Sequence, residues 1–389
     1  MKSKLNVLFV TNQLIYGGAE RYTVSVANYL QNAGCNVAVI SSGGPMQKLL
    51  NKKIKHYLAP VKKTDIFSRI RTIITIAYVS FKIKAQLVHT QSAQGALASR
   101  MAKTVTRIPV VKTAHGYPDG VIPTIAKSLN FTTDKVVMIS DWLSHRMTNF
   151  GLKKEKAKTI LNGIDTSQFV RNRMDKNILR KRYGLEEKDE VIVSVARIVP
   201  EKKFEEFVSW FPYILAKKPT AKLLLVGNGG SDGDWYRNKL IKQIENANLE
   251  KSIKVLKGTH KVSEVLSIAD VFCTPSVGKG FSVLEAMAAG LPVVARRPRG
   301  VADTVKDGIN GFLFSSGDWR SMAEKIVFLL ENKKIARELG QQGRMVVRSH
   351  FTLEQMIDKL EIVYLQMIRG NQVFENVRVK YEHPMMLRS

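Results

Sequence analysis

Short apolar runs alternate along the chain with segments in which apolar residues recur every three or four positions. The runs are typical of strands buried in a parallel sheet, and the longer period is typical of helices packed on one face. In the first part of the chain the pattern predicts strands at residues 5–10, 36–40, 86–90, 110–114 and 135–139, and helices at residues 20–33 and 93–105. It then restarts, with strands at residues 190–196, 221–226, 253–256, 271–274 and 292–295, and helices at residues 203–215, 234–247 and 262–268. The expected fold is α/β, with two doubly wound parallel-sheet domains that face a central cleft.

The domain boundaries follow from the same pattern. The polar, charged segment of residues 162–189 separates the two halves and is expected to be a linker. A length of 389 residues also favours two domains over one. We place the first domain at residues 1–170 and the second at residues 171–351. Helical patterns at residues 322–330, 333–349 and 352–368 follow the last predicted strand.

The stretch between residues 274 and 311 carries the clearest chemical signal. The strand at residues 271–274 ends in Pro-Ser, a glycine-rich turn follows at residues 278–280, and a short helix then contains Glu285. A loop that leads from a strand into a helix N-terminus can bind a phosphate, because free N–H groups and the helix dipole point at the anion. Glu285, about a turn further on, is placed to accept hydrogen bonds from ribose hydroxyls. A nucleoside diphosphate is therefore the first ligand to test.

Three further candidate sites follow predicted strands. Gly17 and Gly18 let the backbone approach a ligand closely, although a plain tight turn explains them nearly as well. His115 ends a strand and precedes a glycine, which favours a functional role, whereas His89 is left open between a structural role and a functional one.

The third site is a pair of cations, Arg197 and Lys202, that follows the first strand of the second half. Arginine offers a bidentate fork and lysine a point charge, so together they can neutralise a diphosphate. The alternative is a solvated charge run, but the pair should face the same sheet edge as Gly227 and the loop before Glu285. The sequence shows no metal-ligand spacing and no Ser-His-Asp arrangement, so we expect no metal and no cofactor.

Charge and hydropathy limit the partners. The net charge is +28, and residues 1–170 hold 24 Lys and Arg against 7 Asp and Glu. Fields of this kind attract polyanions or anionic lipid surfaces. Aromatic residues are only 8% and are not interleaved with basic ones, which argues against nucleic acid. Cys35 and Cys273 lie in apolar runs and are expected to be buried thiols.

The most basic segment, Lys52 to Lys84, has nine Lys and Arg and a single acid, Asp65. Apolar residues recur there at helical spacing between the basic ones, at Ile66, Ile70, Ile73, Ile74, Ala77 and Phe81. Such a helix can lie in an anionic membrane interface or can simply cover a sheet, and both faces can be used at once. No apolar stretch is long enough to span a bilayer, so the expected location is cytoplasmic, with peripheral attachment to the inner face of the membrane.

The ordered motifs resemble the retaining glycosyltransferases of family four, which have the GT-B fold of two Rossmann-like domains. The resemblance covers roughly residues 5–368. It rests on the segments Gly17-Gly18-Ala19-Glu20, His115-Gly116, Asn162-Gly163-Ile164-Asp165 with Phe169, Arg197 with Glu201-Lys202, Val226-Gly227-Asn228-Gly229, and Pro275-Ser276 followed by Glu285 to Val293. It implies that residues 352–389 form a helix that returns to the first domain, followed by a basic tail.

The resemblance also implies roles. The first domain would hold the acceptor, with Glu20 and His89 on that side, and His115 would contact the transferred sugar or the acceptor. Gly17, Gly18 and Gly227 would border the donor. Arg197 and Lys202 would bind the diphosphate and stabilise it as it leaves. Glu285 would hold the ribose, and amides at Ser282, Val283 and Leu284 would add to the phosphate site.

The implied activity is metal-independent, retaining transfer of a hexose from a nucleotide-sugar donor, with UDP expected, to a lipid-linked or cell-surface polysaccharide or lipopolysaccharide acceptor. One position departs from the family, because its signature has a glutamate upstream of Glu285 where this chain offers only Val277 or Lys279. Lys279 would suit an acidic donor sugar such as a uronic acid. Two alternatives stay open: a nucleotide-sugar epimerase, and a catalytically impaired nucleotide-binding partner subunit.

Overall fold

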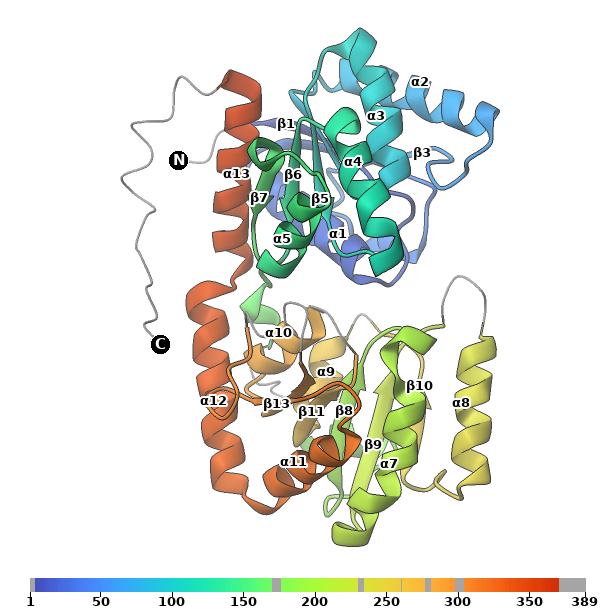
Figure 1. The fold of residues 1–389 in the computed structure, drawn as a ribbon, viewed down its shortest axis with the longest axis vertical. Helices are drawn as coiled ribbons and strands as arrows, with labels where there is room; N and C mark the ends of the chain where they lie inside the picture. The colour runs from blue at the N-terminus through green and yellow to red at the C-terminus, as the bar shows by residue number, and fades with distance from the viewer. Residues whose placement is uncertain are drawn as a thin grey trace.

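The computed structural model describes residues 4–169, 176–229, 234–259, 261–276, 281–297 and 304–370. The chain forms two sheet-based domains, one above the other in Figure 1, with α12 and α13 along one side. The two doubly wound domains predicted from the sequence are confirmed.

The first domain is built on a parallel sheet with strand order β3-β2-β1-β4-β5-β6-β7. Its strands are β1 (Asn6–Val10), β2 (Asn36–Ser41), β3 (Lys55–Leu58), β4 (Leu87–Thr90), β5 (Val110–Ala114), β6 (Lys135–Met138) and β7 (Ala157–Thr159). The order reverses between β1 and β4, so the loops after these strands open on either side of a crevice, where ligands of such sheets bind.

Helices cover both faces of this sheet. They are α1 (Gly18–Asn32), α2 (Ile66–Lys82), α3 (Ala93–Thr106), α4 (Ile122–Thr132) and α5 (Asp141–Asn149). Side-chain caps start three of them, because Asp65, Ser92 and Ser140 each accept a hydrogen bond from a backbone N–H in the first turn. Apolar residues of α1 pack on one face of the sheet, and those of α2 and α3 pack on the other.

The second domain repeats this plan with strand order β10-β9-β8-β11-β12-β13, again all parallel. Its strands are β8 (Glu190–Val195), β9 (Ala221–Val226), β10 (Ile253–Leu256), β11 (Val271–Thr274), β12 (Val293–Arg296) and β13 (Phe312–Phe314). Its helices are α7 (Phe204–Lys217), α8 (Trp235–Asn246), α9 (Val262–Ser267), α10 (Phe281–Ala288), α11 (Trp319–Glu331) and α12 (Lys333–His350). Apolar residues of α7, α8 and α11 share one core with the sheet, and those of α9 and α10 fill the opposite face.

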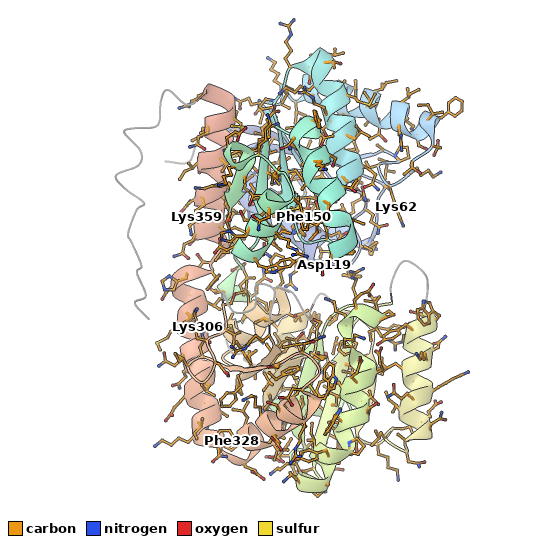
Figure 2. The ribbon with its side chains drawn as sticks, viewed as in Figure 1. Lys62, Asp119, Phe150, Lys306, Phe328 and Lys359 are labelled. Atoms are coloured by element: carbon orange, nitrogen blue, oxygen red, sulfur yellow. The ribbon has the colours of Figure 1, made fainter. Side chains whose placement is uncertain are left out.

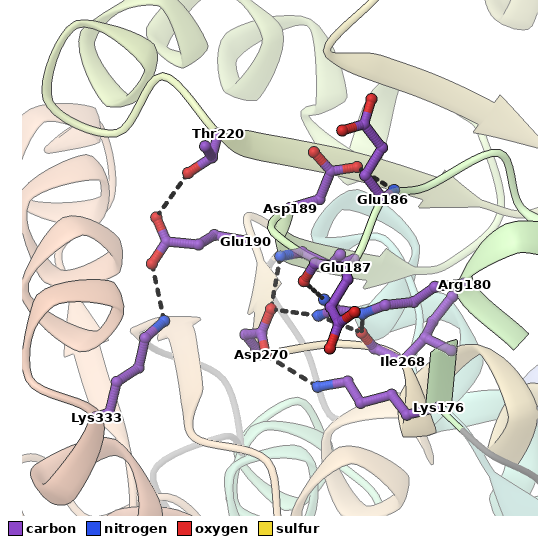
Figure 3. Close-up of polar contacts among 11 residues, drawn as sticks. Lys176, Arg180, Glu186, Glu187, Asp189, Glu190, Thr220, Ile268, Asp270 and Lys333 are labelled. Atoms are coloured by element: carbon purple, nitrogen blue, oxygen red, sulfur yellow. Dashed lines mark hydrogen bonds and ion pairs between the residues drawn. The ribbon is translucent and has the colours of Figure 1, made fainter. Parts of the chain in front are cut away.

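The expectation of a linker over residues 162–189 is wrong for its second half. Residues 176–182 form the helix α6 (Lys176–Arg182), and its Arg180 is buried against the second domain. Figure 3 shows Arg180 donating to the carbonyl oxygens of Ile268 and Glu187 and to the carboxylate of Asp270. Asp270 also accepts from Lys176 and from the backbone N–H of Val191. A polar sequence thus folds here because its charges are paired with one another and with backbone groups.

The chain crosses between the domains twice, and the two crossings are joined to each other. Ile164 donates its N–H to Phe351 and accepts from Leu353, which gives a short parallel bridge. The next element, α13 (Leu353–Arg369), then lies along the first domain (Figure 1). There the hydroxyl of Tyr364 is 2.5 Å from Nδ1 of His89. The last described helix therefore belongs to the core of the first domain.

Candidate functional site

A cleft of about 950 Å³ lies between the two domains and takes walls from both. The residues of interest that line it are Gly17, Gly18, Glu20, Arg21, His115, Asp165, Arg197, Lys202, Gly227, Ser276, Ser282, Val283 and Glu285. Apart from Asp165, they come from the loops that follow β1, β5, β8, β9 and β11 and from the N-terminal parts of α1 and α10. Figure 2 places Asp119, in the loop after β5, on the side of the first domain that faces the second. The convergence follows from parallel strands, whose carboxyl ends share one edge of each sheet.

The paired glycines after β1 bring the two domains close together. Gly17 precedes α1 in an extended conformation, and a Cβ there would lie 2.4 Å from Oε2 of Glu20. A Cβ on Gly18 would lie 3.6 Å from the ring of Phe281, at the start of α10 in the other domain. The backbone of the first domain therefore approaches the start of α10 directly at this point.

Two cations face the cleft after β8. Arg197 is exposed and Lys202 is half-buried in a short 3-10 turn. Burial lowers the pKa of Lys202, and the neighbouring charge of Arg197 lowers it further. Neither side chain takes part in an ion pair within the described part of the chain. Across the cleft, burial raises the pKa of Glu20, and the charge of Arg197 partly opposes this shift. The pair therefore places two positive charges at the cleft, with the Glu20 carboxyl near Arg197 and the Glu201 carboxyl near Lys202.

Gly227 allows the ends of β8 and β9 to lie this close. A Cβ on Gly227 would be 1.8 Å from the carbonyl oxygen of Ala196, a distance that no side chain can occupy. Beside it, Ile198 donates its N–H to the carbonyl oxygen of Asn228. The glycine thus fixes the backbone path that carries Arg197 to the cleft.

Glu285 lies in α10 and is almost fully buried, at 2% exposure. Its Oε1 atom is 2.5 Å from Nη1 of Arg21, which belongs to α1 of the other domain. Burial raises the pKa of the Glu285 carboxyl, and the charge of Arg21 opposes the shift. Ser282 and Val283 line the cleft, whereas Leu284 is buried in the core and does not. The glycine-rich turn with Val277 and Lys279 lies outside the described residues, as does the basic tail beyond residue 370.

The two histidines occupy different environments. His115 lines the cleft, and its Nε2 lies 2.7 Å from Oε1 of Gln91. Burial, and then the charge of Lys112, lower its pKa to about 3, so the ring is neutral at physiological pH. His89 is fully buried between Tyr364 and Thr113 and does not reach the cleft. The ring of His89 therefore faces the core under α13, which supports the structural one of the two roles that the sequence left open and not a place on the acceptor side of the cleft.

Two functional candidates were missed in the sequence. Arg21 follows the Gly-Gly-Ala-Glu segment directly, but its partner Glu285 is distant in the chain, so the sequence gives no sign of the pairing. Lys112 lies inside an apolar strand, and a lysine at such a position is the signal that should have been noted. No group of three His, Cys, Asp or Glu side chains with metal-binding geometry occurs among the described residues.

Two family models match consecutive parts of the chain. Glycosyltransferase Family 4 matches residues 16–168, and Glycosyl transferases group 1 matches residues 175–346. The chain belongs to glycosyltransferase family 4. The two matches correspond to the two sheet domains, and the cleft between them is the cleft of a GT-B enzyme.

Relatives and solved structures agree with this assignment over nearly the whole chain. The family 4 chain is 25% identical to the capsular polysaccharide biosynthesis glycosyltransferase CapM of Staphylococcus aureus, over 88% of this chain and 93% of the relative. It is 23% identical to the UDP-Gal:alpha-D-GlcNAc-diphosphoundecaprenol alpha-1,3-galactosyltransferase of Escherichia coli, over 94% of this chain and 98% of the relative. Anabaena HepE, solved in complex with UDP and glucose, has a TM-score of 0.83 at 20% identity, with 92% of this chain and 99% of that one covered.

The family 4 chain also carries an exposed apolar surface on α2. One face of the helix is buried through Ile76 and Val79. The opposite face exposes large apolar side chains, namely Ile66, Phe67, Ile70, Ile74, Tyr78 and Phe81. Of the other residues in the predicted apolar pattern, Ile73 and Ala77 are half-buried. On the neighbouring α3, Leu97, Met101 and Val105 are exposed as well. Within the described residues, none of the helices combines the length and apolar character needed to cross a bilayer.

Proposed function

We propose that this cleft transfers a hexose, with retention and without a metal, from a UDP-sugar to a lipid-linked or cell-surface polysaccharide or lipopolysaccharide acceptor. The observation that carries the proposal is the pair of cations Arg197 and Lys202, which line the same cleft as Gly18 and the first residues of α10. Two cations that form no close ion pair among the described residues are suited to a dianionic diphosphate. Donors fixed in advance where charge develops stabilise a leaving group more than water does.

The expected chemistry needs no protein nucleophile. The bond between the anomeric carbon and the diphosphate oxygen breaks, the acceptor oxygen attacks from the same face, and its proton passes to the departing phosphate. The carboxylates that line the cleft are engaged elsewhere among the described residues: Glu285 pairs with Arg21, Glu20 faces Arg197, and Asp165 accepts from Ser167 and Gln168. This arrangement favours same-face transfer over a covalent glycosyl-enzyme.

The donor and acceptor classes rest on the relatives. HepE was solved with UDP, the Escherichia coli relative is named for UDP-Gal and a diphosphoundecaprenol acceptor, and the Staphylococcus aureus relative is named for capsular polysaccharide. We therefore propose UDP as the nucleotide and a lipid-linked or polysaccharide acceptor. In this proposal the first domain holds the acceptor and His115 lies beside the sugar.

The exposed face of α2 supports membrane docking in the same proposal. Arg69 lies on one side of the apolar stripe, and Arg71 and Lys82 lie on the other. Apolar side chains flanked by cations suit the interface of an anionic bilayer, where each component adds to binding. Docking there would bring the acceptor domain to a lipid-linked substrate.

A nucleotide-binding panel tests the proposal. UDP, GDP, ADP and dTDP are titrated into the wild-type chain and into an Arg197→Met/Lys202→Met variant, with Lys334→Met on α12 as a matched control for loss of a cation. UDP is expected to raise the unfolding temperature of the wild type and of the control. In the double variant UDP affinity should fall by about a hundredfold, because two charge-assisted contacts are lost.

Unchanged UDP affinity in the double variant would contradict the proposed role of the cation pair. A second assay separates the activities: incubation of wild type with a UDP-sugar and no acceptor should give no epimerised sugar. Transfer to an undecaprenyl-diphosphate saccharide should give a product with the donor's anomeric configuration, and an inverted product would contradict retention.

A further inference from the structure

Arg21 and Glu285 form the one ion pair that joins the two sheet domains within the described residues. Arg21 is in the first turn of α1 and retains 28% side-chain exposure, whereas the Glu285 side chain retains 2%. Both line the cleft. The pair therefore lies inside the proposed donor site.

The two charged groups of this ion pair lie close together, but their hydrogen-bond geometry is poor. Nη1 of Arg21 and Oε1 of Glu285 are 2.5 Å apart, yet Oε1 makes no hydrogen bond of good geometry. A buried carboxylate is stabilised more by hydrogen-bond donors that point at its lone pairs than by a cation that lies off the hydrogen-bond direction. Ribose hydroxyls can supply such donors, whereas the guanidinium, held on α1, does not.

We propose that Arg21 is a positioning residue of the donor site that occupies the Glu285 carboxylate in the empty enzyme and is displaced from it by the ribose hydroxyls. The inference rests on the proposed function, in which Glu285 holds the ribose. The Arg21 guanidinium and the ribose hydroxyls then compete for the Glu285 carboxylate. The pair keeps the domains together before the donor arrives, and donor binding exchanges this link for one through the nucleotide.

The exchange has a measurable consequence. When a binding-competent state is only a fraction of the population, the apparent dissociation constant rises by the inverse of that fraction. Removing the competing guanidinium should therefore tighten nucleotide binding, which is opposite to the effect expected for an arginine that contacts the donor's phosphates.

The experiment compares UDP with 2′,3′-dideoxy-UDP by titration calorimetry. Arg21→Met is expected to bind UDP about tenfold more tightly than wild type, which corresponds to a carboxylate that is free in about one molecule in ten. Binding of dideoxy-UDP should not change, because it lacks the hydroxyls that compete with the pair. Arg21→Lys should restore wild-type UDP affinity in part, and Arg100→Met, an exposed cation on α3, should change neither ligand. In a Glu285→Gln background, Arg21→Met should have no effect.

The other outcomes are decisive. Weaker binding of both nucleotides by Arg21→Met would make Arg21 a direct phosphate ligand or a purely structural residue, and would overturn the inference. Equal tightening of both nucleotides would overturn it too, since the ribose would then play no part. Failure of the wild type to bind any nucleoside diphosphate would instead remove the proposed function itself.

Discussion

Lys112 is the residue whose environment differs most from that expected of its type. It lies in the middle of β5 at 1% exposure, and it has no ion pair in the part of the chain that the structure describes. Its Nζ atom is 5.9 Å from the centre of the Tyr117 ring. Burial lowers the pKa of this lysine to about 7. The folded protein therefore holds the lysine largely neutral above that pH.

Protein stability should for this reason rise with pH in a window set by Lys112. The unfolded lysine keeps its proton to about pH 10, so between about pH 7 and pH 10 the unfolded state binds more protons than the folded one. The free energy of unfolding should rise by about 2 kcal/mol between pH 7.5 and pH 9.5, relative to Lys112→Met. Urea unfolding of both proteins at the two pH values measures this difference.

The titratable groups near Lys112 do not contribute to the pH dependence of stability in this range. His89 and His115 have pKa values lowered to about 3, and burial raises the pKa of Tyr117 well above its usual range. None of the three titrates in the folded state between pH 7.5 and 9.5. Parallel pH dependence in wild type and variant would show that Lys112 is charged when folded.

Residue identity and strand position predicted much of the candidate site. Gly17, His115, Arg197 and Gly227 each follow a strand, and the structure brings all four to one cleft. The same reasoning left the role of His89 open, because a strand end says nothing about which face of the sheet its side chain takes. That face is decided by Tyr364, which arrives from the last described helix.

At the scale of elements, α2 shows how far a pattern can be interpreted. The sequence predicted a basic amphipathic helix, and the structure adds that its core-facing side and its exposed side are separate stripes.

Short elements were harder to predict. The strands β3 and β7 are polar edge strands without an apolar run, and α6 is held by the ion pairs of Lys176 and Arg180 and by a single buried apolar residue, Leu179. Hydrophobic periodicity cannot reveal elements whose stability comes from partners far along the chain.

The membrane proposal makes a prediction for this helix. Replacing Phe67 and Phe81 together with serine should weaken binding to phosphatidylglycerol vesicles by about a hundredfold, since each exposed aromatic ring would bury its apolar area in the interface. Phe131→Ser, on α4, removes an equally exposed ring outside the stripe and is the matched control. Vesicle flotation at low and high salt measures the effect. Equal binding by the double variant and the control, or no binding by wild type, would contradict membrane docking through α2.

At the scale of the whole molecule, the two segments that cross between the domains are in contact with each other. A Cβ on Gly163 would lie 2.1 Å from the carbonyl oxygen of Thr352, and this backbone cannot move without breaking the bridge from Ile164. The two crossings between the domains therefore meet at a close backbone contact that favours glycine at residue 163. Sequence motifs marked this segment, but its pairing with residue 352 depends on a contact that no local pattern encodes.

Gly163→Ala should accordingly weaken this contact between the two crossings. We expect the free energy of unfolding to fall by about 2 kcal/mol or more, with weaker UDP binding, because the cleft walls lose their fixed relation. Gly120→Ala is the control, since a Cβ there meets no atom within 4 Å and should change stability by less than about 0.5 kcal/mol. Thermal unfolding and UDP titration measure both. Equal behaviour of the two variants would show that the close approach at Gly163 is relieved without cost.

The position of α13 has a consequence for biosynthesis. Its buried side chains, among them Ile357, Leu360 and Tyr364, complete the same core as Phe9 and Leu30 of the first domain. A ribosome makes Phe9 early and Tyr364 only after the entire second domain. Domains usually fold as units while the chain emerges. Here the nascent first domain keeps an open apolar groove until α13 has been made, so its folding is complete only after the second domain has been synthesised.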